Sequence, residues 1–275
     1  MNNTKNIILV ILLSLIISQE EQPYPPLDLI SIPTAGTLPR GFFSMETILM
    51  EDGGLLPKVQ FGITDRFTFG VSFGVQGFIG TGDIEKNKSA PEVQIKYRIY
   101  EETEEMPAVA IGLNTQGKGR FYEREDLRRY EQKAFGVYAL ISRNWNLLGN
   151  LGFHIGLNKN LFENNDKDED MNLFFGFDKE INESFSFLLE YNFSRDDDGE
   201  SDSGNEIIIR RGKGYLNSGI RWSATDNLML EINVNDMLKN NKYLDYLPNE
   251  NNDGVELKEF ESMNREVKII YFEEF

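Results

Sequence analysis

The segment 66–76 alternates at every position between apolar and small or polar side chains. Its apolar parity is Phe67, Phe69, Val71, Phe73 and Val75, and its other parity is Thr68, Gly70, Ser72, Gly74 and Gln76. Because successive side chains of a β-strand point to opposite faces, one face of this segment is continuously apolar. The other face is small, as the crowded inner wall of a closed barrel requires. The pattern predicts a barrel strand whose apolar face is turned to lipid.

Similar segments recur along most of the chain, with lengths that suit a tilted strand crossing a bilayer. The predicted strands are 41–50, 55–64, 66–77, 91–100, 107–116, 132–143, 148–159, 171–179, 184–194, 214–223, 227–236 and 264–275. They predict an all-β fold, a single antiparallel up-and-down transmembrane barrel of about 12 strands. A soluble sandwich, or an exported barrel with a dry core, is the alternative that the same alternation allows.

The connections between these segments alternate in length. The short ones are 64–65, 101–106, 144–147, 180–183 and 224–226, and the long hydrophilic ones are 78–90, 117–131, 160–170, 195–213 and 237–263. Only the connection 51–54 is short where a long one is expected. This alternation is typical of an outer-membrane barrel with short periplasmic turns and long outer loops, and it places both termini on the periplasmic side.

The chain before the first strand divides into two parts. Residues 1–18 have the basic start and apolar stretch of a cleaved secretory signal peptide, and the alternative is a membrane anchor, for which the apolar stretch is short. Residues 19–40 are rich in proline and are expected to be extended, outside any regular strand ladder. The barrel is expected to occupy 41–275, and the protein is expected in the outer membrane.

The amino-acid composition excludes several classes of partner and site. The net charge of −17 argues against nucleic acid as a partner, because its phosphates would be repelled. The chain has no cysteine, which excludes disulfides, thiolate metal sites, a catalytic cysteine and a lipoprotein anchor. No cofactor is predicted.

Charged side chains also lie on the inward parity. The lumen-facing candidates are Glu46, Lys58, Glu92, Lys96, Arg98, His154, Glu190, Arg221, Glu231 and Lys268. Their mixed signs suit either a lumen crosslinked by ion pairs or a narrow polar pore. The set lacks the excess of Arg and Lys that an anion-selective channel should show.

His154 is the only histidine and would need a nucleophile and an orienting group to act as a catalytic base. The serines predicted to face inward are Ser72, Ser142, Ser186 and Ser194. Nothing in the sequence selects one of them, so no catalytic residue is assigned. An outer-membrane hydrolase that uses His154 is kept as one alternative function.

Two acidic loops, 164–170 and 196–202, could offer oxygen ligands to Ca²⁺, but neither has the spacing of an EF-hand loop. Solvated surface is the favoured interpretation, and no metal site is predicted. An aromatic girdle is expected near the strand ends. Its members are Tyr97, Trp145, Tyr191, Tyr215 and Trp222.

The segment 33–41, Pro-Thr-Ala-Gly-Thr-Leu-Pro-Arg-Gly, resembles the start of YjbH-like outer-membrane proteins. The turn 62–66 and the strand opening 149–152 are similar to features of the same barrels. The resemblance implies an outer-membrane barrel and a link to exopolysaccharide production or secretion. It carries over no functional residue. The C-terminal strand, ending in Phe275, resembles the recognition signal of the barrel-assembly machinery.

The leading function is therefore non-enzymatic, a passive conduit or envelope component that is linked to polysaccharide export. A structural or adhesive barrel with a plugged lumen and acidic extracellular loops is a second interpretation. The expected partners are outer-membrane lipid, lipopolysaccharide, the barrel-assembly machinery and transported polysaccharide or small solutes.

Overall fold

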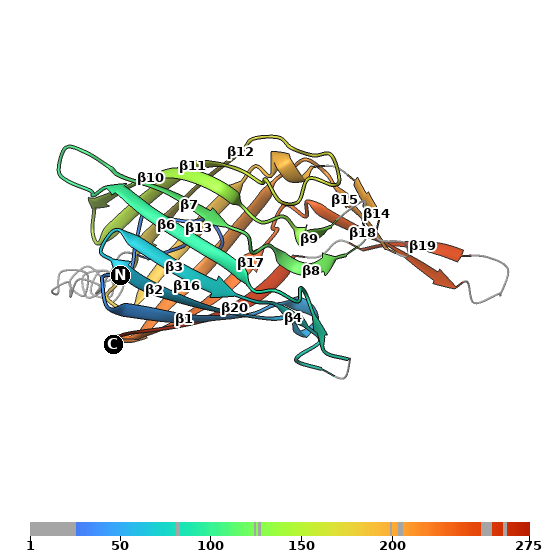
Figure 1. Ribbon diagram of the computed structural model, residues 1–275, viewed down its shortest axis with the longest axis horizontal. Helices are drawn as coiled ribbons and strands as arrows, with labels where there is room; N and C mark the ends of the chain where they lie inside the picture. Colours follow the sequence, from blue (N-terminus) through green and yellow to red (C-terminus); the bar gives the residue numbers. More distant parts are fainter. Residues whose placement is uncertain are drawn as a thin grey trace, which may run out of the picture.

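The computed structural model describes residues 26–80, 83–123, 125, 128–198, 200–202, 206–248, 255–260 and 263–275. The predicted signal peptide 1–18 and residues 19–25 lie outside the described residues. Within the described chain, twelve strands form one closed antiparallel barrel (Figure 1). The all-β barrel predicted from the alternation is confirmed.

Each barrel strand pairs with the next one along the chain, and the last strand pairs with the first. The barrel strands are β1 (Phe42–Leu49), β2 (Leu55–Thr64), β3 (Phe67–Ser72), β6 (Glu92–Tyr100), β7 (Ala108–Asn114), β10 (Gly136–Asn146), β11 (Asn150–Lys159), β12 (Asn172–Glu180), β13 (Phe185–Asn192), β16 (Tyr215–Thr225), β17 (Leu228–Asn235) and β20 (Asn264–Glu274). Closure comes from β1, which pairs with β2 on one side and with β20 on the other. A closed barrel leaves no strand edge, so its backbone hydrogen bonds are satisfied without water.

The two ends of the barrel differ in their connections. We call the end that carries the short turns and the C-terminus the short-turn end, and the opposite end the long-loop end (Figure 1). Register shifts occur at the short-turn end of three strand pairs, beside Gly62, Arg98 and Ser223. Such shifts bend a strand where it leaves the ladder for a turn.

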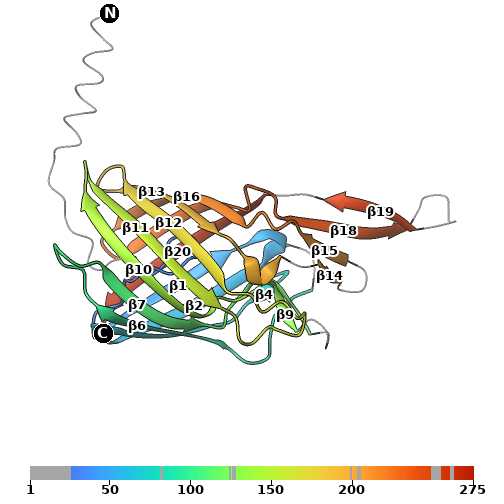
Figure 2. The same ribbon diagram turned by 90° about the horizontal axis from the view of Figure 1, so that it is seen from above.

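The long connections contain regular structure that the sequence reading treated as loops. Near the barrel these are η1 (Glu51–Gly53), β4 (Val75–Gln76), β5 (Glu85–Lys86), β8 (Lys118–Tyr122), β9 (Arg129–Gln132) and η2 (Arg195–Asp197). A separate four-stranded sheet is made by β14 (Glu200–Asp202), β15 (Glu206–Arg210), β18 (Asn241–Pro248) and β19 (Val255–Phe260). Figures 1 and 2 show that it extends beyond the barrel at the long-loop end.

The outer surface of the barrel is apolar. Large side chains such as Ile141, Phe153, Ile155 and Ile232 are exposed there, whereas the other parity of each strand is buried inside. Edge-to-face and stacked ring pairs join Trp145 to Phe153 and Phe185 to Trp222. An apolar exterior around a closed barrel is the surface that lipid requires, and it makes this an outer-membrane protein.

The aromatic girdle needs one correction. Tyr97, Trp145 and Trp222 are exposed on the outer surface, as expected. The prediction for Tyr215 is wrong, because its side chain is buried and its hydroxyl hydrogen-bonds Asn241 at 2.9 Å. Tyr215 faces the lumen at the start of β16, on the parity of Arg221. Among the described residues, no helix is long and apolar enough to cross a membrane.

The largest apolar core lies inside the lumen, and the N-terminal segment forms its centre. Residues 26–40, which we call the plug, fold back inside the barrel. The plug side chains Leu29, Ile30 and Ile32 are buried against the wall residues Leu140 and Leu188. A second cluster packs Leu27 and Leu38 against Met229 and Phe272. The proline-rich sequence predicts an extended segment, but it does not place that segment in the lumen.

Candidate functional site: the plugged lumen

All ten lumen-facing candidates lie on the inner side of the barrel, and the structure divides them into two groups. Seven surround the plug: Glu46, Lys58, Lys96, Glu190, Arg221, Glu231 and Lys268. The other three have partners outside the plug, although His154 reaches the plug through Ser142. Glu92 pairs with Lys88 at 2.5 Å, Arg98 donates to the Asp65 carbonyl at the short-turn end, and His154 contacts Ser142 and Asp178.

Glu190 on β13 binds the backbone of the plug tip. Its carboxylate accepts hydrogen bonds from the N–H groups of Ile30, Ser31 and Ile32 at 2.9–3.0 Å, and from the Ser31 hydroxyl. Consecutive N–H groups point the same way because the plug turns here, with the Leu29 N–H bonded to the Ile32 carbonyl at 2.9 Å. Such a turn is a backbone nest that suits an anion. The wall carboxylate is 1 % exposed, so these are charge-assisted bonds out of water.

The opposite side of the same turn faces cations. Lys268 donates to the Ile30 carbonyl at 2.8 Å, and Arg221 donates to the Asp28 carbonyl at 2.9 Å. The plug turn therefore presents its N–H groups to the Glu190 carboxylate and its carbonyl groups to the cations Lys268 and Arg221. This complementarity fixes the orientation of the turn in the lumen.

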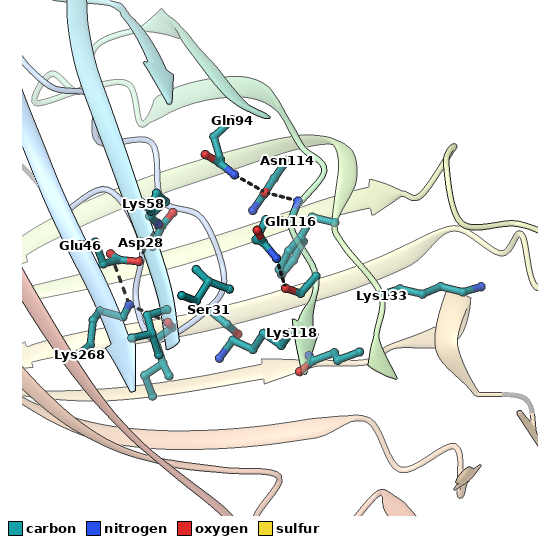
Figure 3. A pocket seen from close by; sticks show the side chains of 16 residues that line it. Asp28, Ser31, Glu46, Lys58, Gln94, Asn114, Gln116, Lys118, Lys133 and Lys268 are labelled. Carbon is teal, nitrogen blue, oxygen red and sulfur yellow. Dashed lines mark hydrogen bonds and ion pairs between the residues drawn. The ribbon is translucent and has the colours of Figure 1, made fainter. Parts of the chain in front are cut away.

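Asp28 is the charged side chain of the plug that contacts the lumen wall, whereas Arg40, at the end of the plug, is exposed. Its carboxylate pairs with Lys58 at 2.9 Å and with Lys96 at 3.7 Å. Figure 3 shows Asp28 beside Lys58, with Glu46 and Lys268 close by on the neighbouring strands. Lys96 also donates to the Leu27 carbonyl. A buried cation is stable only with such compensation.

Ion pairs within the wall link the same side chains. Lys58 contacts Glu46 at 2.8 Å, and Arg221 contacts Glu231 at 2.6 Å. Lys268 lies between the two acids, 3.5 Å from Glu231 and 3.9 Å from Glu46. The mixed charges predicted on the inward parity thus form one network that includes the plug.

Small wall residues make room for the plug. A Cβ atom on Gly176 would lie 2.6 Å from Leu29 Cδ1 and 2.9 Å from Ile32 Cδ1. A Cβ atom on Gly62 would lie 1.9 Å from the Pro39 carbonyl oxygen. Thr68, a small polar residue of the opening pattern, accepts the Leu38 N–H at 3.0 Å. The small inner face seen in the sequence is therefore the surface that the plug contacts.

Ser142, His154 and Asp178 form a chain of contacts across β10, β11 and β12. Ser142 Oγ lies 2.7 Å from His154 Nδ1, and His154 Nε2 lies 2.9 Å from Asp178 Oδ1. A nucleophile, a base and an acid at these distances could activate the serine. However, the plug N–H of Ala35 already donates to Ser142 Oγ at 2.9 Å, and Ser142 and His154 are 4 % exposed. The contacts suit anchoring of the plug better than acyl transfer.

A second charged cluster lies near the long-loop end. We define the loop cluster as Arg129, Lys133, Glu163, Asp166, Asp197 and Arg210. Arg129 pairs with Asp166 at 2.7 Å and with Asp197, while Lys133 pairs with Asp166 at 2.9 Å. Glu163 accepts the N–H groups of Tyr130 and Ala134 at 2.7 Å.

This cluster corrects the interpretation of the acidic loops as solvated surface at three positions, whereas Glu169, Asp170 and Asp198 are exposed as expected. Asp196 and Asp197 are buried, and Asp166 is buried at its side chain. Burial raises the pKa of Asp166, but the hydrogen bond and charge of Lys133, with the charge of Arg129, outweigh it and lower that pKa. Burial, and then the charge of Asp197, raises the pKa of Asp196 to about 7. Within the described residues, no acidic or histidine side chains are grouped to hold a metal ion.

A cavity of about 60 Å³ lies in the lumen beside the plug, with room for a few water molecules (Figure 3). Asp28, Ser31 and Lys58 line it from the plug and the wall, and Lys118 and Lys133 line it from the loops. Lys118 pairs with Glu266 at 3.0 Å. The cavity therefore separates the plug from the loop cluster.

Sequence reasoning missed Asp28, Asp178 and the basic residues of the loop cluster. Asp28 had a local signal, since it is an acid inside an apolar run bounded by prolines, in an exported chain. Arg129 had none, because it lies in the hydrophilic connection 117–131 like many solvated cations.

No protein-family model and no curated protein sequence matches the chain. Solved structures that it resembles include the NanC porin, with 8% identity, coverage of 84% of this chain and 99% of the porin, and a TM-score of 0.39. Another is the outer-membrane channel DcaP of Acinetobacter baumannii, with 9% identity, coverage of 85% and 96%, and a TM-score of 0.32. A loop-deletion mutant of OmpT, an outer-membrane protein of Vibrio cholerae, has 8% identity, coverage of 84% and 98%, and a TM-score of 0.31. Similarities this low identify neither a family nor a function.

Proposed function

We propose that this protein is an outer-membrane conduit that its own N-terminal plug keeps closed. The observation that carries the proposal is the docking of the plug turn, whose N–H groups bind Glu190 while its carbonyl groups bind Arg221 and Lys268. The plug is held by its buried apolar side chains, by its backbone and by Asp28, and it can leave without breaking any pairing between barrel strands.

The lumen wall supports this proposal. Inward positions around the plug include Gln60, Gln94, Asn217 and Asn233, all buried and polar. A lumen that is packed only to stabilise the fold could use apolar wall side chains instead, as the cores of soluble proteins do. Removal of the plug would expose these polar wall positions to water, as an aqueous passage requires, together with the apolar wall residues Leu140 and Leu188.

Small solutes are the proposed cargo. Exopolysaccharide, the cargo that the YjbH-like resemblance implies, belongs to the same proposal. The proposed surroundings are outer-membrane lipid and lipopolysaccharide, after insertion by the barrel-assembly machinery, with no role for nucleic acid and no enzymatic step.

The test is the conductance of two purified proteins in planar bilayers, the full-length chain and a variant that lacks residues 27–38. We expect little steady current from the full-length chain and a steady ohmic current from the variant. A gel-mobility shift on boiling shows that each protein is folded. A folded variant without current would overturn the conduit and favour a structural or adhesive barrel.

A hydrolase is the second candidate, because one specific observation favours it. That observation is the chain of contacts from Ser142 through His154 to Asp178. It would require the plug to leave, since Ala35 covers the serine oxygen.

A further inference from the structure

We propose that the lysine pair Lys58 and Lys96, which holds Asp28 in the closed state, is the binding site for the carboxylate of a small anionic solute. The proposal rests on the plugged conduit and gives the chemical class of its solute. Asp28 is then an internal substitute for that solute's carboxylate.

The pair is arranged around the two oxygens of one carboxylate. Lys58 Nζ lies 2.9 Å from Asp28 Oδ2, and Lys96 Nζ lies 3.7 Å from Asp28 Oδ1. The two lysine side chains are 11 % and 5 % exposed, so water contributes little to their solvation. The site therefore suits one anion whose two oxygens are each contacted by one ammonium group.

Departure of the plug affects the two lysines unequally. Lys58 keeps its wall partner Glu46. The contacts of the Lys96 ammonium in the described structure, the Asp28 carboxylate and the Leu27 carbonyl, both belong to the plug. An open lumen would thus present Lys96 as a wall cation whose partners have left with the plug. A solute carboxylate would restore that pairing.

Glu190 adds a second requirement on the solute. In the closed state it accepts N–H groups of the plug as well as the Asn217 amide at 2.8 Å. Once the plug leaves, its carboxylate can accept hydroxyl or amide N–H groups of a solute. A small hydroxy acid meets both requirements, whereas a neutral sugar offers Lys96 hydroxyl oxygens but no negative charge.

The closed structure has open space beside Lys58 of the lysine pair. Asp28 and Lys58 both line the cavity of about 60 Å³ beside the plug. A carboxylate as small as acetate could occupy the space left by the Asp28 side chain. This makes chemical rescue of the full-length chain the direct test.

The experiment compares thermal unfolding of the folded wild type and of Asp28→Ala, in detergent, in acetate or in chloride at equal ionic strength. We expect acetate to raise the unfolding temperature of Asp28→Ala progressively with its concentration, and to leave the wild type unchanged. The double variant Asp28→Ala, Lys96→Gln should lose the acetate effect. Equal responses of the three proteins, or rescue by chloride alone, would overturn the proposal.

If Asp28→Ala does not fold in chloride, its refolding yield replaces the unfolding temperature. A yield that rises with acetate supports the site, and a failure that acetate does not change overturns it. Neither result depends on current through the barrel. Loss of the anion site and loss of the conduit are therefore separate outcomes.

Discussion

Glu190 accepts a hydrogen bond of 3.0 Å from the backbone N–H of Ile32, a residue 158 positions earlier in the chain. One wall side chain therefore recognises the plug by its backbone shape. The bond ties the β13 wall to a segment that precedes the first strand. Five expectations follow from this arrangement and from the clusters around it.

Glu190→Gln should increase the frequency with which the plug leaves the lumen and the conduit opens. The variant keeps an acceptor but loses the charge that strengthens its bonds to the plug N–H groups, and hydrogen bonds to a charged group contribute about 1.5–3 kcal/mol. We expect the open population to rise roughly 10- to 100-fold, measured as opening frequency in planar bilayers. Glu183→Gln, at an exposed turn, is the control and should behave as wild type. Identical frequencies in both variants would show that Glu190 does not hold the plug.

Gly176→Ala should loosen the plug, because the added Cβ meets Leu29 and Ile32. The chain has no cysteine, so Ser31→Cys gives a single reporter at the plug tip. We expect faster labelling of that cysteine by a maleimide when Gly176→Ala is present. Ala139→Val adds volume on the outer face of β10 and should leave labelling unchanged. Slower labelling in Gly176→Ala would contradict the fit described here.

Arg129→Met should reduce the order of the long loops that the loop cluster holds together. The substitution removes one of the two cations that pair with Asp166 and with Asp197, which keep Lys133 and Arg210, so its cost is at most the about 3–5 kcal/mol of breaking a buried ion pair. We expect proteinase K to cut the long loops faster while the barrel stays heat-modifiable. Arg66→Met, at an exposed pair near the short-turn end, is the matched control. Unchanged cleavage would mean that the cluster does not order these loops.

Asp196→Asn should stabilise the protein in a pH-dependent way. The pKa of Asp196 is raised to about 7, so the folded state binds a proton that the unfolded state releases near its ordinary pKa. The wild type therefore loses stability as pH rises from about 4 to 7, and the loss is constant above that range. We expect the variant's advantage in unfolding temperature to be small at pH 4 and full at pH 8. Asp226→Asn, in an exposed turn, should show no such trend.

Ser142→Ala should weaken the docking of the plug and should not change ester hydrolysis. It removes the acceptor of the Ala35 N–H, and an unsatisfied buried donor costs about 1–3 kcal/mol. We expect faster maleimide labelling of a Ser31→Cys reporter in Ser142→Ala. Ester hydrolysis should stay at background in the wild type and in His154→Ala. Hydrolysis that disappears in His154→Ala would establish the hydrolase instead.

The barrel could be predicted from the sequence because its signal is local. In β11, the lipid-facing side chains of Phe153 and Ile155 alternate with the inward His154, and the same period of two recurs in the other barrel strands. The sheet outside the barrel lacks this signal. Its strand Glu206–Arg210 contains three consecutive isoleucines without alternation.

The plug could not be placed in the same way. Its partners lie as far as 239 residues away, as in the contact of Leu29 with Lys268, and no period relates them. The parity argument put Lys58, Lys96 and Glu190 on the inner wall, but it could not show what they bind. The docking of Asp28 appears only when strands from both halves of the chain form one lumen.

Closure of the barrel between β1 and β20 has a consequence for the order of folding. The plug touches β3 through Leu38, β13 through Ile32 and β20 through Ile30, so it contacts strands all around the ring. The final pairing, of Phe42 with Glu274 and its neighbours, completes the ring around this segment. The described residues before the first strand then form a core around which the later strands assemble. Closure becomes a late, long-range step, and such steps are slow.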